Sequence, residues 1–177
     1  FPYTGYSGES PRGWEGMYSG ASVGLAVLRR DGFASMDAGP EGGVLTTRPV
    51  IFSGRQLFVN VDCPEGVLRV EVLDAEGNPI EGLTEAQSLP VSADRTLRAI
   101  NWRTGEDLSA LAGRPVRFRF HLTNGRLYAF WVSPDTSGAS HGYMAAGGPG
   151  FDGTVDTRGA AAYRDAAGLL PPSLRRP

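Results

Sequence analysis

The feature that most constrains the fold is a strict two-residue alternation of apolar and polar side chains over residues 116–122. The apolar positions are Val116, Phe118, Phe120 and Leu122, and the polar positions are Arg117, Arg119 and His121. Successive side chains of a β-strand point to opposite faces of its sheet. The run therefore predicts a strand with one face in the core and the other in contact with water or a polar partner.

A second apolar run at residues 126–132 follows the turn-forming tripeptide Thr123-Asn124-Gly125, so residues 115–133 are predicted to form a β-hairpin. The loop length decides which face of the second strand is buried. A two-residue loop places Leu127, Ala129 and Trp131 on the core face, whereas a three-residue loop places Tyr128, Phe130 and Val132 there. We favour the second alternative because it gathers bulky side chains opposite those of the first strand.

The favoured register places Trp131 on the outer face, beside Arg117 and Arg119, and makes it more accessible than Phe130. Sugar rings stack their apolar faces on exposed aromatic rings, while arginine, asparagine and carboxylate groups bind the hydroxyls. Trp131, Arg117 and Arg119 are therefore a candidate carbohydrate platform, which His121 and Trp102 could extend. The alternative is that Trp131 lies in the core or is covered by another segment.

Glycine (25 of 177 residues) and proline (13) are frequent, and turn signals recur about every ten residues. This pattern favours an all-β fold, an antiparallel β-sandwich of jelly-roll character. Other strands are expected at residues 22–29, 33–37, 44–47, 56–62 and 67–73, with short strands around 89–91 and 98–102. A helical turn is expected at residues 107–113, capped by Asp107 with Leu108 and Leu111 inward, and a brief helix at residues 160–167.

The composition divides the chain into three parts. Residues 1–20 are aromatic and glycine-rich and are expected to form an irregular arm or linker, residues 21–133 the sandwich, and residues 134–177 a Gly/Ala/Pro-rich tail that packs on the sandwich or on a partner. The length suffices for one sizeable core. Because the sequence begins at Phe1, we expect a processed product or a piece of a longer protein.

Charge and cysteine content exclude several function classes. The net charge is −2, which gives no reason to expect nucleic acid or an anionic membrane as a partner, and no apolar run is long enough to span a bilayer. All 17 basic residues are arginine, which favours planar, bidentate ion pairs. Cys63 is the single cysteine, so it cannot form an internal disulfide or a cysteine zinc site, and we expect a buried, inert thiol.

Three further constellations carry weaker signals. A glycosidase needs two carboxylates about 5 to 10 Å apart, and Asp62 with Glu71 or Asp37 with Glu41 could meet across strands. Asp31, Asp37 and Asp107 are candidate ligands of a calcium ion, although turn capping is the stronger expectation for each. Asp135, Ser140 and His141 are the residue types of a catalytic triad, but the glycine-rich sequence around them lacks a nucleophile elbow.

A family resemblance adds to this reading. The stretch Val23-Gly-Leu-Ala-Val-Leu-Arg-Arg-Asp-Gly-Phe-Ala-Ser-Met-Asp37, with residues 45–50, 57–61, 68–74, 107–115 and 115–133, resembles a bacterial β-sandwich domain. That domain follows a five-bladed propeller similar to glycoside hydrolases of the invertase, inulinase and β-xylosidase clan. The similarity covers about residues 21–133. In such proteins the catalytic carboxylates belong to the propeller, and nothing in this chain matches them.

The resemblance implies a non-catalytic accessory or carbohydrate-binding module of an exported glycoside hydrolase. Its partners would be a polysaccharide or oligosaccharide and a β-propeller catalytic domain, its location secreted or periplasmic, and it would need no cofactor. One rival is a structural or assembly subunit that docks through its terminal arms by strand addition. Another is a glycan-active hydrolase in its own right.

Overall fold

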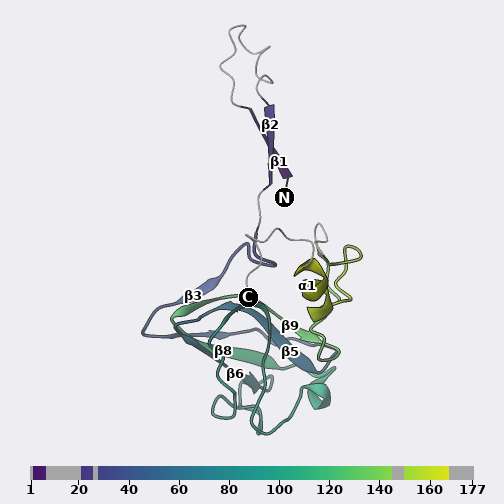
Figure 1. Cartoon of the computed structure of the whole chain (residues 1–177). Helices are drawn as coiled ribbons and strands as arrows, with labels where there is room; N and C mark the ends of the chain where they lie inside the picture. Colours follow the sequence, from purple (N-terminus) through teal and green to yellow (C-terminus); the bar gives the residue numbers. More distant parts are fainter. Residues whose placement is uncertain (1, 7–20, 26–27, 145–149, 168–177) are drawn as a thin grey trace.

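The computed structural model describes residues 2–6, 21–25, 28–144 and 150–167. These residues form an all-β, sandwich-like fold with antiparallel strand pairs, as predicted (Figure 1). The β9 sheet consists of β3 (Met36–Ala38), β9 (Gly125–Ser133), β5 (Gln56–Asp62) and β7 (Asp94–Ala99), in that order. The β8 sheet consists of β4 (Gly43–Thr46), β8 (Arg117–Thr123) and β6 (Val67–Leu73).

The hydrophobic core lies between these two sheets and follows from the alternation along their strands. The buried inner positions are Leu57, Val59 and Val61 of β5, Val70 and Val72 of β6, and Phe118 and Phe120 of β8. Phe130 of β9 meets the two β8 rings across the interface, with centroid distances of 5.7 Å to Phe118 and 5.0 Å to Phe120. These aromatic contacts join the two layers.

The predicted hairpin over residues 115–133 is wrong, although both of its strands are present. β8 and β9 lie in different sheets, and the chain crosses from one layer to the other at Asn124. Asn124, not Gly125, adopts the left-handed conformation (φ 46°). A Cβ atom at Gly125 would lie 2.5 Å from the Cβ of Cys63, so the close approach requires glycine. The crossing lets the bulky faces of both strands pack against each other.

A register shift in β9 corrects the second half of that prediction. Ala129 pairs with Asn60 and Leu127 with Val61, so Tyr128 is an extra residue in the strand. Such a bulge breaks the alternation. Leu127 is therefore buried on the inner side (4% exposed), and the partly buried Phe130 and Val132 also pack against the core. The ring of Tyr128 instead lies under the guanidinium of Arg29. Each proposed loop length predicted part of the buried face.

Beyond these two sheets, the described residues contain four smaller elements. β1 (Pro2–Tyr6) and β2 (Ala21–Leu25) pair with each other in a separate sheet, so the first residues contain a strand where an irregular arm was expected. The predicted turn at residues 107–113 contains a 3-10 helix, η2 (Ser109–Leu111), with Leu108 and Leu111 buried as expected. Helix α1 (Ala160–Ala167) has the predicted bounds.

Candidate functional site

The five predicted binding residues do not form one site. Arg117, Arg119 and His121 lie on the outer face of the β8 sheet, as their alternation predicted. Trp131 lies on the outer face of the β9 sheet, which is the opposite side of the sandwich. The expectation that it stands beside the two arginines is wrong, because that expectation rested on the hairpin.

Trp102 belongs to the hydrophobic core and not to a binding surface. Its side chain is 3% exposed, and its indole Nε1 donates a hydrogen bond of 3.0 Å to the carbonyl of Val70. The hydrogen bond satisfies the only polar atom of the indole. Trp102 cannot extend a carbohydrate platform in this fold.

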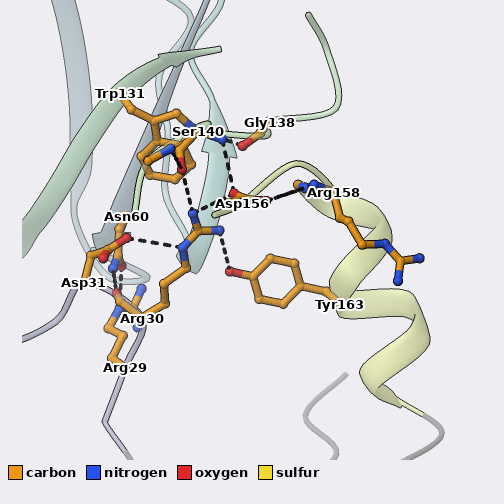
Figure 2. Close-up of polar contacts among 12 residues, drawn as sticks. Arg29, Arg30, Asp31, Asn60, Trp131, Gly138, Ser140, Asp156, Arg158 and Tyr163 are labelled. Carbon is orange, nitrogen blue, oxygen red and sulfur yellow. Dashed lines mark hydrogen bonds and ion pairs between the residues drawn. The ribbon is translucent and has the colours of Figure 1, made fainter. Parts of the chain in front are cut away.

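Trp131 is covered by segments from both ends of the chain (Figure 2). Its ring stacks on that of Phe58, with centroids 5.9 Å apart, and its Nε1 donates to the carbonyl of Gly138 at 3.0 Å. The guanidinium carbon of Arg30 lies 5.3 Å from the ring centroid, a cation–π arrangement. The indole is thus partly buried, and these contacts compete with stacking on a sugar.

The cover over Trp131 is held in place by a buried ion pair. Nη2 of Arg30 lies 2.7 Å from Oδ2 of Asp156, and their side chains are 9% and 0% exposed. Burial raises the pKa of Asp156, but hydrogen bonds from the N–H groups of Gly159 and Ser140 and from Arg30 outweigh it, so that pKa is lowered. The carboxylate therefore remains charged and clamps its own segment and Ser140 to the loop that carries Arg30.

A second arginine fixes the same loop to the β9 sheet. Arg29 donates to the side chains of Asn60 and Asp94 and, at 2.8 Å, to the carbonyl of Val61. The Asn60 side chain in turn donates to the carbonyl of Arg30. Asn60 is fully buried and stands next to the register shift of β5 and β9. This network has a structural role, because its donors and acceptors satisfy one another.

The outer face of the β8 sheet carries the most organised array of accessible polar groups. Its centre is Glu71 of β6, which is 6% exposed and pairs in register with Arg119. Oε1 of Glu71 lies 3.1 Å from Nη1 of Arg119 and 3.0 Å from Nε2 of His121. A carboxylate only accepts hydrogen bonds, so Nε2 carries the hydrogen. One buried carboxylate therefore orients two basic side chains that are 32% and 23% exposed.

Two more arginines of this face are held by uncharged acceptors. Arg117 donates from Nε to the carbonyl of Ala75 (3.1 Å) and from Nη1 to that of Thr47 (3.4 Å). Arg69, which pairs in register with His121, donates from Nη1 to the carbonyl of Ser88 at 2.6 Å. We refer to Arg69, Glu71, Arg117, Arg119 and His121 as the polar face. Glu85 lies at its edge, with Oε2 3.6 Å from Nδ1 of His121.

The other carboxylate candidates are placed apart or have local partners. Asp62 lies on β5 and Glu71 on β6, in different sheets, so the predicted meeting across strands is wrong. Asp31, Asp37 and Asp107 each pair with a nearby arginine, respectively Arg30, Arg126 and Arg55. The described part of the chain contains no group of three or more His, Cys, Asp or Glu side chains that could hold a metal ion.

Ser140 of the triad-like segment contributes to the Arg30 clamp. Its Oγ accepts a hydrogen bond from Nη2 of Arg30 (3.2 Å), and its N–H donates to Asp156 (3.1 Å). Asp135 accepts from the N–H of Ser137 at 2.7 Å, which is a local turn interaction. These three contacts stabilise the segment around Gly138, which binds the indole of Trp131.

Comparisons with known proteins leave the family open. No family model, curated protein or solved structure matches the chain. Across the described ranges, no helix is both long and apolar enough to cross a membrane. The resemblance to a propeller-associated domain therefore stays a prediction from the sequence.

Sequence reasoning identified three of the five residues of the polar face. The alternation of β8 predicted these residues, whereas Arg69 was missed and Glu71 was considered only as a glycosidase carboxylate. The same signal was available, because Leu68, Val70 and Val72 alternate with both of them. The pairing of β6 with β8 was not predictable from either strand alone. The Arg30–Asp156 clamp was missed for a similar reason, since its members are 126 residues apart.

Proposed function

We propose that this chain is a non-catalytic accessory module that binds glycans through its polar face. The supporting observation is the arrangement of Arg119 and His121 around one buried carboxylate, Glu71. Sugar hydroxyls both donate and accept hydrogen bonds, so they are best recognised by side chains fixed in advance. Glu71 supplies this fixation together with Thr46, whose Oγ1 accepts a hydrogen bond of 3.1 Å from Nε of Arg119.

The resemblance described above is consistent with this proposal. A sandwich that accompanies a propeller hydrolase would place its binding surface next to the substrate of the catalytic domain. On this view the parent enzyme is exported, and the chain acts in a secreted or periplasmic setting. The catalytic carboxylates would belong to the partner domain.

A binding screen with the intact chain tests the proposal. We expect retention on at least one polysaccharide from a panel of plant and microbial glycans, without release of reducing sugar. Arg119→Ala should weaken retention about tenfold, because it removes a charged donor and leaves Glu71 without its arginine partner. Arg98→Ala is the matched control, since Arg98 is an exposed arginine on β7 of the other sheet.

Other outcomes of the screen contradict the proposal. Retention that Arg119→Ala leaves unchanged would move the binding site away from the polar face. Release of sugar by the isolated chain would favour the hydrolase hypothesis instead. The absence of retention on every glycan would refute the proposal.

A second candidate function is docking to a neighbouring subunit through β1 and β2. Tyr3 and Val23 of this separate sheet are 58% and 77% exposed, so it offers apolar surface to a partner. Sedimentation velocity would test this idea: the intact chain should self-associate, and deletion of residues 1–25 should abolish association.

A further inference from the structure

The polar face carries an excess of positive charge. Three of its residues are arginines (Arg69, Arg117 and Arg119), whereas Glu71 is its one carboxylate and Glu85 lies at its edge. The excess is local, because the whole chain has a net charge of −2. A positive patch on a molecule of negative net charge favours negatively charged ligands.

The partners of the arginines show where this charge is not neutralised. Arg119 forms an ion pair with Glu71. Arg117 and Arg69 instead donate to main-chain carbonyls, and no carboxylate among the residues that the structure describes lies within ion-pair distance of either. The carbonyls fix the two guanidinium groups without cancelling their charge. Each group keeps further N–H donors in the planar fork that matches a carboxylate or a sulfate.

Strand geometry arranges these groups as a two-dimensional array. Outward-facing residues along β8, such as Arg117 and Arg119, are separated by about 6.5 Å, and neighbouring strands by about 4.8 Å. Arg69 of β6 stands opposite His121, and Leu73 stands opposite Arg117, so the arginines occupy different positions along the face. Such an array fits an extended ligand with repeated negative groups better than a single small anion.

We propose that the glycan recognised by the polar face is acidic and carries carboxylate or sulfate groups that bind Arg69 and Arg117. This inference rests on the proposed glycan-binding function and adds the chemical class of the ligand. Arg119 and His121, oriented by Glu71, would bind the hydroxyls between the charged groups. Arg69 stands opposite His121 and Arg117 stands opposite Leu73, so the two acidic groups would lie toward the two ends of the face, on either side of the Glu71–Arg119 pair.

Matched pairs of polysaccharides test the inference with the intact chain. Polygalacturonate and its fully methyl-esterified form share a backbone and differ in charge, and a sulfated galactan can be compared with its desulfated form. We expect binding to the acidic member of at least one pair to be about tenfold tighter, and to weaken as sodium chloride rises from 50 to 300 mM. Whichever pair shows the preference identifies carboxylate or sulfate as the recognised group.

Two variants test whether these arginines bind the acidic groups of the glycan. Arg117→Gln and Arg69→Gln should each reduce binding to the acidic glycan about tenfold and so remove most of its preference over the neutral form. Arg98→Gln is the control and should change neither. Thermal unfolding of each variant verifies the fold, and the two positions are independent, so a folding defect in one leaves the other as a test.

The possible failures are distinguishable. Equal binding of the acidic and neutral forms would refute the inference and leave the glycan-binding function intact. A preference that survives both substitutions would place the acidic group elsewhere and also refute it. If no glycan of either kind binds, the proposed function fails together with the inference.

Discussion

Removal of the Asp156 carboxylate is expected to be among the most damaging single substitutions outside the core. The side chain is 0% exposed, and it accepts four hydrogen bonds within the clamp. Oδ2 accepts from Arg30 (2.7 Å) and from the N–H of Ser140 (3.1 Å). Oδ1 accepts from the N–H groups of Arg158 (3.1 Å) and Gly159 (2.8 Å). Asp156→Ala leaves all four donors without this acceptor.

The magnitude follows from the charge that is left behind. Removing one partner of a buried ion pair costs about 3–5 kcal/mol, because the other charge remains buried and unpaired. The segment that carries Asp156 can detach and let Arg30 hydrate, which limits the loss. We therefore expect the free energy of unfolding to fall by about 3 kcal/mol, at the lower end of this range.

Two measurements check this expectation. Urea unfolding gives the change in free energy, and exchange of the Trp131 indole N–H reports on the cover, because that group donates to Gly138. Asp156→Ala should accelerate the exchange strongly. The control is Asp152→Ala: Asp152 is 75% exposed and pairs with Arg158, so its loss should change stability by less than about 0.5 kcal/mol.

The same carboxylate predicts a pH dependence. Because the pKa of Asp156 is lowered in the folded protein, its stabilising contribution is fully present above the unfolded value, about 3.9. That contribution is lost as the pH falls from there through the lowered native pKa, and Asp156→Ala should lack this part of the acid transition. A variant that loses less than about 1 kcal/mol, with unchanged indole exchange, would refute the reasoning.

Three further predictions concern single residues. Trp131→Phe keeps most of the stacking on Phe58 and removes the indole donor, so chemical denaturation should show a loss of about 1 kcal/mol. Gly66→Ala should cost about 1–3 kcal/mol in the same assay, because its Cβ atom would lie 2.0 Å from the carbonyl oxygen of Thr123. Cys63 is fully buried, and burial raises the pKa of its thiol, so iodoacetamide should label it only after unfolding; rapid labelling of the native protein would contradict this burial.

Some predictions from the sequence succeeded because they depend on local geometry. Alternation along β8 identified its buried face, and the expected strands at residues 56–62 and 67–73 have the observed bounds. The helix at residues 160–167 was also predicted correctly. In each case neighbouring side chains and the backbone period carry the information.

Predictions that depended on contacts between distant segments failed. The hairpin was wrong because strand alternation says nothing about which sheet a strand joins. The register of β9 was partly wrong because the extra residue at Tyr128 depends on pairing with β5. Trp131 and Trp102 were assigned to a surface for the same reason, since their cover comes from other parts of the chain.

The sequence by itself determined that this protein is an all-β sandwich and that Arg117, Arg119 and His121 share an outward face. A two-residue period is a property of the extended backbone, so it is readable without knowledge of the fold. The tertiary structure alone decided that Glu71 and Arg69 join this face and that Trp131 is covered. Those outcomes depend on strand pairing and on the Arg30–Asp156 ion pair, which bring together residues far apart in the chain.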